Sequence, residues 1–469
     1  MPQYISKTKY LEGLICPKLL WYEYNRRDAF PPVDAKTQDR FDQGHMIGET
    51  AHKLFPGGIR LERLKDPAAM SEASAKALSL GVPLFEAGFV HKNAYAIADI
   101  LLSAGKGSWD IVEVKSSTRI KEDYLHDLAF QKYVYGGAGL KINRACLMHI
   151  DNTYIRRGDI ELDKLFKKED LTEQADELIP GIEKRIQAML EIISAPEAPA
   201  VETGEQCNKW SGCPLCEVCF TDPEDYLRLK LRRAIQIESH RTGKPHVDRE
   251  ALREFIGRLR YPLYFLDFET ISPAIPIYDL TSPYEVVPFQ FSLHVQEKDV
   301  GDPVHYSFIA PGDVDPRPGI LSKLERLLGT SGSIVAYAAD YEKRCLDRAA
   351  DVYPEYDEWF ESVRDRFVDL WEPFRRLDFY SPKQNGSTSM KEVLPALTGH
   401  GYDKMEISDG ETASREYMRV TFGGGADKKD RAEVLSALEK YCALDTGGMV
   451  EIINELGKKV GGLTGYGLS

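Results

Sequence analysis

The sequence predicts an α/β protein with two domains, on the basis of three observations. At 469 residues the chain is longer than one hydrophobic core usually serves. Strand-like and helix-like apolar patterns alternate in both halves, which is typical of sheets with flanking helices. Residues 223–260 are highly charged and separate the two patterns. We therefore expect one domain at residues 1–222, a helical connector at 223–260 and a second domain at 261–469.

The composition indicates a well-packed protein of a reducing compartment. Hydrophobic residues make up 43% and charged residues 29% of the chain, and no run of about 18 apolar residues could span a membrane. No basic stretch leads into an apolar segment at the N-terminus, so we expect a cytoplasmic protein that makes no membrane contact. The formal net charge of −14 argues against a broad basic surface that coats DNA, but not against a local groove.

The first half predicts a mixed sheet with flanking helices. Strand-like runs and segments of helical period follow in the order β-β-β-α-β after two initial helices. Pro17 interrupts the first helix, and Pro56 with two glycines ends the second. The expected helices are residues 7–24, 39–55, 122–135 and 171–193, and the expected strands are residues 82–90, 94–102, 109–115 and 145–150.

Two of these strands carry a candidate metal site. The two-residue period of a strand places Glu113 and Lys115 on one face and Val112 and Val114 on the other. That pair alone also suits a solvated sheet edge. Asp99 ends the preceding apolar run, so two carboxylates converge if the strands are neighbours, and carboxylate oxygens suit Mg²⁺ or Mn²⁺. Lys115 could then orient the attacking water and neutralise a phosphate.

Two predicted helices add polar residues to this site. Gln131 and Tyr135 are four residues apart and share a helix face. His52 follows Gly48 by the same spacing, and its imidazole could complete the ligand set of a metal. A lone histidine is more often structural, so this interpretation of His52 depends on the residues around it.

Five cysteines bracket the first half and predict a metal centre that closes the domain. One thiol lies near the N-terminus and four lie about 190 residues downstream, so a shared centre requires the chain to return to its start. Either a [4Fe–4S] cluster or a structural zinc ion takes four thiolates, which leaves one thiol over. The five thiols are Cys16, Cys207, Cys213, Cys216 and Cys219.

The other three cysteines have a simpler interpretation. Cys146, Cys345 and Cys442 lie in apolar surroundings, and we interpret them as core thiols. A reducing compartment makes disulfides between any of the eight cysteines unexpected.

The first constellation resembles the PD-(D/E)XK nucleases of the RecB family. The resemblance rests on Asp99, on the Glu-x-Lys of Glu113 and Lys115, and on Gln131 with Tyr135, and it covers roughly residues 5–220. It implies a restriction-endonuclease-like mixed sheet with flanking helices. The implied roles are metal binding for His52, Asp99 and Glu113, catalysis for Lys115 together with Asp99 and Glu113, and positioning of DNA or of the active-site core for Gln131 and Tyr135.

The cysteines resemble the iron–sulfur variety of that family, as in AddB and the CRISPR-associated RecB-like exonucleases. The opening Ser6 and Lys7, and residues 16–21, are also similar to the first motif of that group. The resemblance favours an iron–sulfur cluster over zinc and leaves Cys216 as the additional thiol. The implied cluster ligands are Cys16, Cys207, Cys213 and Cys219.

The second half predicts another α/β domain. The pattern begins at Tyr261, and no repeat or low-complexity segment interrupts it. The expected strands are residues 262–268, 288–295, 304–309 and 333–338, and the expected helices are residues 321–328, 340–350, 356–377 and 431–456.

A second carboxylate set lies in this half. Asp267 and Glu269 share one face of a strongly apolar strand, and buried carboxylates without partners are costly, so the strand either binds a cation or simply ends at the surface. Tyr441 and Asp445 are four residues apart on a predicted helix. A phenol beside an acid at that spacing could orient a metal-bound water.

This second set resembles the DEDD exonucleases of the RNase H-like superfamily, in the variant with tyrosine in the last motif. The first motif would be Asp267 with Glu269, and the last would be Tyr441 with Asp445. Glu342 would be the middle metal ligand, where most of the superfamily has Asp, and Ala338 stands where Asn is usual. Residues 288–294 and 386–395 also resemble an uncharacterised bacterial family that joins such a domain to a RecB-like nuclease.

The sequence thus predicts a metal-dependent nuclease with two hydrolytic heads, using Mg²⁺ or Mn²⁺. We expect DNA as the partner, as single strands or ends, with a role in repair, recombination or defence. Two alternatives stay open: a nucleic-acid-binding subunit with one inactive head, and an RNA-processing exonuclease. No Walker-type phosphate-binding motif is present, so ATP is not implied, and the sequence does not decide whether a helicase is a partner.

Overall fold

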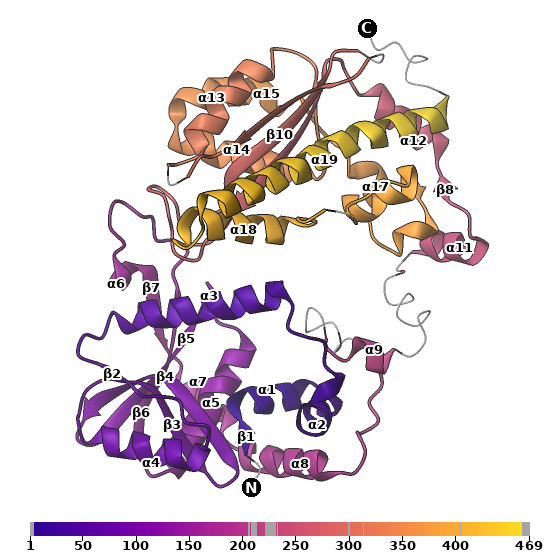
Figure 1. Cartoon of the computed structure of the whole chain (residues 1–469). Coiled ribbons are helices and arrows are strands. Elements are labelled where there is room, and N and C mark those ends of the chain that lie inside the picture. The colour runs from indigo at the N-terminus through magenta and orange to yellow at the C-terminus, as the bar shows by residue number, and fades with distance from the viewer. Residues whose placement is uncertain are drawn as a thin grey trace. The chain divides into compact units, whose positions relative to one another are not determined.

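The computed structural model divides into two compact units (Figure 1). Unit 1 consists of Met1–Thr221 and Ala274–Tyr284, and unit 2 of Asp222–Pro273 and Glu285–Ser469. Both are mixtures of sheet and helices, which confirms the α/β class. Among the described helices, none combines the length and apolar composition of a membrane-spanning segment. The described residues are 4–204, 207, 213–220, 231, 233–298, 301–312, 314–403 and 405–461.

Unit 1 is built around a seven-stranded sheet in the order β2-β3-β4-β5-β6-β7, with β1 parallel to β4. Strands β3, β4 and β5 form an antiparallel meander, and β6 returns parallel to β5 through helix α5 (Glu122–Gly137). The strands are β1 (Ile5–Ser6), β2 (Ile59–Arg60), β3 (Leu84–His91), β4 (Ala94–Gly105), β5 (Ser108–Lys115), β6 (Lys141–Ile150) and β7 (Phe166–Asp170).

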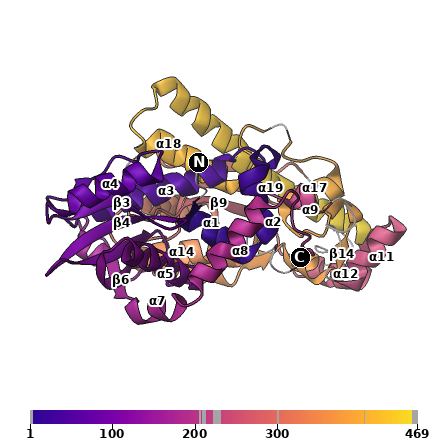
Figure 2. The same ribbon diagram turned by 90° about the horizontal axis from the view of Figure 1, so that it is seen from below.

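The helices of unit 1 begin at sequence signals typical of N-termini. Asp34 and Asp66 accept backbone N–H groups at the starts of α3 and α4, and Pro17 begins α2. Helices α1 and α2 pack against α8 (Figures 1 and 2). The helices besides α5 are α1 (Lys7–Ile15), α2 (Pro17–Asn25), α3 (Ala35–His52), α4 (Pro67–Leu78), α6 (Leu162–Leu165), α7 (Thr172–Leu178), α8 (Ile182–Ser194) and α9 (Cys216–Cys219).

The single helix predicted over residues 171–193 is wrong. The structure has α7 and α8 instead, with Pro180 and Gly181 between them. Gly181 has φ 94°, a left-handed conformation that glycine adopts without steric cost. The apolar period continues on both sides of this break, so periodicity alone could not locate it.

Unit 1 also contains a segment from the second half of the sequence. Residues Ala274–Tyr284 belong to it, although we expected a continuous domain at 261–469. Leu280 N donates to Arg156 O at 2.9 Å, and Arg156 N donates to Thr281 O at 3.0 Å. Ala274 is buried in the same apolar cluster as Ile47. Apolar burial and paired backbone groups therefore hold this segment in unit 1.

Unit 2 contains a five-stranded sheet in the order β11-β10-β9-β12-β13 and a two-stranded sheet, β14-β8. Strands β9, β10 and β11 are antiparallel, whereas β12 and β13 run parallel to β9. The strands are β8 (His246–Val247), β9 (Leu263–Ile271), β10 (Val287–Gln296), β11 (Val304–Ile309), β12 (Ser333–Ala336), β13 (Phe367–Asp369) and β14 (Phe379–Tyr380).

Helices cover both faces of the five-stranded sheet. Tyr264, Leu266 and Phe268 of β9 pack in one cluster with α13 to α15, and the alternate residues of β9 face α19. Figure 1 shows the long helix α19 running across the sheet. The helices are α11 (Ala234–Thr242), α12 (Arg249–Gly257), α13 (Arg317–Leu327), α14 (Asp340–Val352), α15 (Asp357–Arg364), α16 (Glu372–Arg376), α17 (Met390–Thr398), α18 (Gly410–Phe422) and α19 (Lys428–Val460).

Two further expectations for the second half need correction. The helix predicted over residues 356–377 is divided into α15, strand β13 and α16, because β13 pairs with β12 at the edge of the sheet. The described part of the 223–260 connector is not a separate element: α12 packs on α19, and β8 pairs with β14. Residues 223–230 and 232 lie outside the described residues.

Candidate functional sites

Neighbouring strands of unit 1 bring the predicted carboxylates together. Ile100 of β4 pairs with Val112 of β5, which places Asp99 beside the end of β5. The backbone N–H of Val114 donates to Asp99 Oδ2 at 2.7 Å. Glu113 is buried, with 1% of its surface exposed, whereas Asp99 is half-buried. Strand pairing therefore sets the two acids side by side, as the sequence suggested.

Two residues outside the predicted set complete this cluster. Lys7 Nζ lies 2.6 Å from Glu113 Oε1 and 3.4 Å from Asp127 Oδ1. Lys115 Nζ lies 2.7 Å from Glu113 Oε1 and 2.7 Å from Asp127 Oδ2. The sequence carried a signal for Asp127, because it precedes Gln131 by four residues and shares its helix face. The four charges form a closed network of two ammonium groups and two carboxylates.

This network controls ionisation in the first site. Burial and the charge of Glu113 raise the pKa of Asp99 to about 7. Burial opposes ionisation of Glu113 as well, but the ammonium groups of Lys115 and Lys7 outweigh it and hold the pKa of Glu113 well below its usual value. Burial works against the charge of Lys115, yet Asp127 and Glu113 raise its pKa well above the ordinary value. Lys115 therefore stays an ammonium group.

The other predicted residues of the first site fall into two groups. Gln131 Nε2 donates to Glu113 Oε2 at 2.7 Å and to Asp127 Oδ1 at 2.8 Å, so Gln131 positions the acids. Tyr135 is fully buried; it donates to Ala87 O and accepts from Ala98 N at 2.8 Å, which makes it a support of the sheet.

His52 lies where a further ligand could come from. Its ring stacks on that of Phe85 with 4.0 Å between centroids, and burial lowers the pKa of His52, so the imidazole is neutral. The backbone of Asp99 is near enough to affect that pKa. His52 Nε2 is buried and has no hydrogen-bond partner among the described residues. A neutral imidazole with an unpaired nitrogen suits a metal ion.

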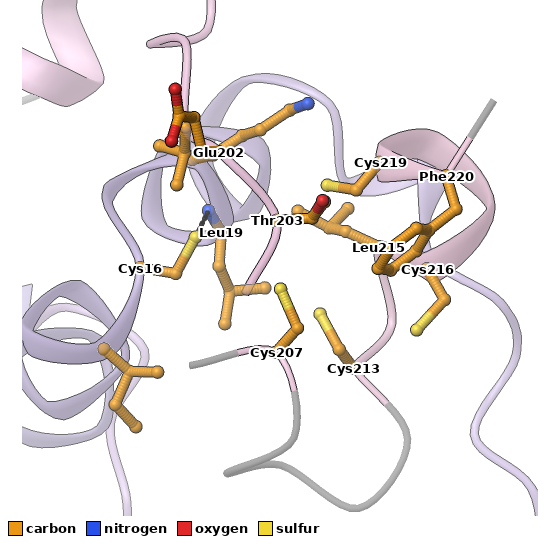
Figure 3. A pocket seen from close by; sticks show the side chains of 13 residues that line it. Cys16, Leu19, Glu202, Thr203, Cys207, Cys213, Leu215, Cys216, Cys219 and Phe220 are labelled. Atoms are coloured by element: carbon orange, nitrogen blue, oxygen red, sulfur yellow. Dashed lines mark hydrogen bonds between the residues drawn. The ribbon is translucent and has the colours of Figure 1, made fainter. Parts of the chain in front are cut away.

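The five cysteines of the bracket line one cavity of unit 1 (Figure 3). The chain does return to its start, because Cys16 at the beginning of α2 shares this cavity with the thiols around α9. Burial raises the pKa of Cys213, and the neighbouring Cys216, Cys219 and Cys207 raise it further. Cys216 is thus inside the thiol group, and its exclusion from a set of four ligands stays a prediction.

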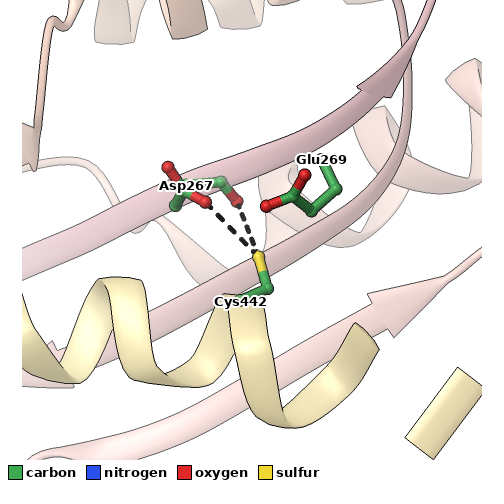
Figure 4. Close-up of side chains that lie close together, drawn as sticks. All are labelled: Asp267, Glu269 and Cys442. Atoms are coloured by element: carbon green, nitrogen blue, oxygen red, sulfur yellow. Dashed lines mark hydrogen bonds between the residues drawn. The ribbon is translucent and has the colours of Figure 1, made fainter. Parts of the chain in front are cut away.

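Strand β9 positions the first two acids of the second site. Asp267 and Glu269 lie on the face of β9 that meets α19, and Glu269 is 6% exposed. The thiol of Cys442 on α19 lies 3.5 Å from Asp267 Oδ2 and 3.8 Å from Asp267 O (Figure 4). One oxygen of each acid and the sulfur all lie within 4.8 Å of one another. Cys442 is fully buried, as expected of a core thiol, but its neighbours include the carboxylates Asp267 and Glu269.

The remaining predicted acids converge on the same place. Burial raises the pKa of Asp267, and the charge of Asp445 raises it further. Burial also raises the pKa of Glu269, with Asp267 and Asp445 adding to the shift, and that of Glu342, with Asp267 adding to it. Burial raises the pKa of Asp445 to about 7. Helices α14 and α19 thus bring Glu342 and Asp445 to the acids of β9.

Two tyrosines and a lysine border these acids. Tyr402 OH donates to Asp445 Oδ1 at 2.5 Å, and its ring lies 6.0 Å from that of Tyr441. Lys391 Nζ lies 5.9 Å from the Tyr402 ring and 5.7 Å from the Tyr441 ring, and its charge lowers the pKa of Glu269 and Asp445 against the effect of burial. Sequence reasoning missed Tyr402, which lies outside the segments singled out, and gave no role to Lys391, although it lies within residues 386–395.

Ala338, at the position where Asn is usual, has a structural explanation. It adopts a left-handed conformation with φ 67° between β12 and α14. Its backbone N–H donates to Asp369 Oδ1 at 2.9 Å, and Asp369 also accepts from Trp371 N at 3.0 Å. Asp369 therefore holds the turn that leads to Glu342, and no side chain is needed at position 338 for this contact.

Comparison with known proteins gives limited matches. A family model described as a domain of unknown function (DUF2779) matches residues 264–389, which include Asp267, Glu269 and Glu342. No curated protein sequence matches the chain. One similar solved structure, titled "Crystal structure of SSO0001", has 10% identity and a TM-score of 0.25 over 47% of this chain and 86% of that chain. A TM-score of this size does not establish a shared fold.

Proposed function

We propose that the chain is a divalent-metal-dependent nuclease with one hydrolytic site in each unit. The observation that carries the proposal is the convergence of Asp267, Glu269, Glu342 and Asp445 in unit 2, where burial raises all four pKa values and repulsion by neighbouring acids adds to the shift for Asp267, Glu269 and Glu342. Three buried acids and the half-buried Asp267 in one place are unfavourable without a cation. Glu342 Oε2 has no hydrogen-bond partner among the described residues, which leaves a donor for such an ion.

In unit 2 the four acids would hold Mg²⁺ or Mn²⁺, which polarises a phosphate and activates water. Tyr441 lies four residues before Asp445, and its phenol would orient the attacking water. Burial raises the pKa of Tyr441 far above its usual value, so the phenol keeps its proton and could donate it in a hydrogen bond to that water. Lys391 beside both tyrosine rings would bind the phosphate of the substrate.

In unit 1 the donors fit a metal in part. Asp99 accepts from a backbone N–H, and His52 Nε2 has no described partner, so both have free electron pairs. Glu113 is paired with Lys7 and Lys115, and it would have to exchange one of them for the ion. Lys115, which would keep Asp127 as a partner, could then contact the scissile phosphate, where a permanent ammonium stabilises developing charge.

The assignment of each unit to a nuclease class rests on the resemblance of its motifs and on the contacts among its acids. The PD-(D/E)XK assignment of unit 1 and the RNase H-like assignment of unit 2 are supported by the acids that each set of motifs brings together. For the thiols, either a zinc ion or a [4Fe–4S] cluster takes four thiolates, and the resemblance to the iron–sulfur nucleases favours the cluster.

The test is cleavage of labelled single- and double-stranded DNA and of RNA with Mg²⁺ or Mn²⁺. Lys115→Ala should abolish the products of unit 1, and Asp267→Ala those of unit 2, by at least about a hundredfold each. Lys121→Ala and Asp340→Ala, exposed residues near each site, serve as matched controls. Intact substrates in every metal, or unchanged products in both variants, would contradict the proposal. The RNA arm distinguishes the RNA-processing alternative.

A further inference from the structure

The second site contains a donor that hydrolytic metal sites of carboxylates do not need. Cys442 Sγ lies within 4.8 Å of an oxygen of Asp267 and of Glu269, and its two hydrogen bonds are both to Asp267 (Figure 4). The thiol is fully buried, so it is not there to meet solvent. A buried thiol among acids is a poor hydrogen-bond partner, since S–H is only a weak donor.

The spacing of these donors matches a particular class of ion. Metal–sulfur and metal–oxygen bonds of about 2.3 and 2.0–2.2 Å, at a tetrahedral angle, place sulfur and oxygen about 3.5 Å apart. Cys442 Sγ and Asp267 Oδ2 lie 3.5 Å apart. Sulfur is a ligand for Zn²⁺ and similar soft ions and not for Mg²⁺, which takes oxygen. The pair is therefore already at the separation that a thiophilic ion requires.

The charges around the thiol also require a cation. Within the described part of the chain, no Lys, Arg or His forms an ion pair with Asp267 or Glu269. Glu342, 3% exposed, has an oxygen without a hydrogen-bond partner among the described residues, and its charge interacts with that of Asp267. Asp267 itself is half-buried, which leaves one side of the group open to an ion from solvent.

We propose that Asp267, Glu269 and Cys442 form a binding site for a thiophilic divalent cation such as Zn²⁺, with Cys442 Sγ as a direct ligand. Binding replaces the S–H bond with a metal–sulfur bond, and the proton leaves to solvent. The site shares its two carboxylates with the proposed nuclease centre, so Zn²⁺ and Mg²⁺ compete for it. The inference concerns binding and does not depend on catalysis.

The experiment uses Cd²⁺ as a probe, because a cadmium–thiolate bond absorbs in the ultraviolet. The full chain is titrated beside Cys442→Ala and the control Cys345→Ala, which removes another buried thiol of unit 2. The thiols of unit 1 are the same in all three proteins, so the difference isolates Cys442. In Cys442→Ala, the ultraviolet absorbance at saturation should fall by the contribution of one thiolate. The affinity for Cd²⁺ at one site should fall by at least about tenfold. Cys345→Ala should have the absorbance and affinity of the parent chain. Mg²⁺ should weaken this one site in the parent chain.

A second measurement keeps the inference testable if Cys442→Ala does not fold. Anomalous scattering from a Cd²⁺-soaked crystal of the parent chain should show an ion bonded to Cys442 Sγ and to Asp267. An absent peak at saturating Cd²⁺, or a Cys442→Ala titration that superimposes on the parent, overturns the proposal. Cd²⁺ at Cys442 in a chain that cleaves no substrate would leave this inference standing and reject the nuclease.

Discussion

In unit 1, Glu113 and Asp127 are each paired with Lys7 and Lys115, whereas in unit 2 the acids of β9 face Asp445, Glu342 and a thiol. The first arrangement neutralises its charge from within the chain. In the second, Lys391 offsets only part of the repulsion, and protons or an added cation can relieve the rest. The difference shows that an acid can be neutralised by lysines of the chain in one site, whereas in the other site it lacks such partners among the described residues and favours binding of a metal ion.

Removing one acid from unit 1 gives the largest expected effect. Glu113→Gln leaves two largely buried ammonium groups with only Asp127, and breaking a buried pair costs about 3–5 kcal/mol. Hydrogen exchange of the amides in β4 and β5 should show a free energy of opening that is lower by this amount. Glu49→Gln, which removes an exposed partner of Arg60, should change it by less than about 1 kcal/mol. Equal effects of the two substitutions would reject the paired description of unit 1.

Metal addition should act mainly on unit 2. Mg²⁺ or Mn²⁺ at a hundred times its dissociation constant stabilises the binding state by about 2.7 kcal/mol. In unit 2 the ion relieves repulsion, but in unit 1 it must first displace Lys7 or Lys115 from Glu113. Hydrogen exchange at β9 and α19, compared with and without EDTA, measures the gain. In Asp267→Ala, the metal-dependent gain in unit 2 should disappear, whereas any gain in unit 1 should remain. A larger gain in unit 1 than in unit 2 of the parent chain would contradict the expectation.

Removing an acid from unit 2 should have the opposite sign from Glu113→Gln. Asp445→Asn takes one negative charge away from Asp267 and Glu269, and Asn can still accept the hydrogen bond of Tyr402. Without metal at pH 8, we expect a gain in stability on the order of 1 kcal/mol, since one pKa unit corresponds to about 1.4 kcal/mol. The gain should vanish in Mg²⁺. Denaturant unfolding monitored at α19 checks this, with exposed Asp340→Asn as the neutral control.

Sequence patterns located the acids better than they located their partners. Strand period and order predicted that Asp99 and Glu113 would converge in the first site. The convergence of Asp267 with Asp445 in the second site followed from the resemblance to the DEDD exonucleases. Lys7 reaches Glu113 across 106 positions of sequence, and no local pattern encodes such a contact. The sequence predicted Cys442 to be a core thiol because the residues next to it in sequence are apolar. In space, however, it lies beside the acids of β9.

The same limit explains the errors in the fold. Residues 274–284 continue from β9 in sequence, yet they pack in unit 1, since their apolar side chains find a cluster there. The break between α7 and α8 depends on one left-handed residue, Gly181. The short strand β13 depends on its pairing with β12. Periodicity reports which face of an element is apolar, but not which partner covers it.

The smallest expected effect is a pH dependence of unit 2 that comes from outside the acids. His294 stacks on His305 at 4.5 Å between ring centroids and contacts Thr446 Oγ1 at 2.8 Å. Burial and His305 lower the pKa of His294 to about 4, below the ordinary 6.5. Between these values the unfolded chain binds a proton that the folded chain does not, so stability should fall as the pH drops from 6.5 towards 4.

His294→Asn should remove this dependence while keeping a polar group near Thr446. Because the ring is only partly buried, we expect the difference between pH 7 and pH 4.5 to shrink by on the order of 1 kcal/mol. The measurement is denaturant unfolding of unit 2 at both pH values in EDTA. His400→Asn removes an exposed histidine and should leave the parent profile unchanged. Parallel profiles for the parent and His294→Asn would reject His294 as a source of the pH response and leave it to the carboxylates and to other histidines of unit 2 such as His305 and His240.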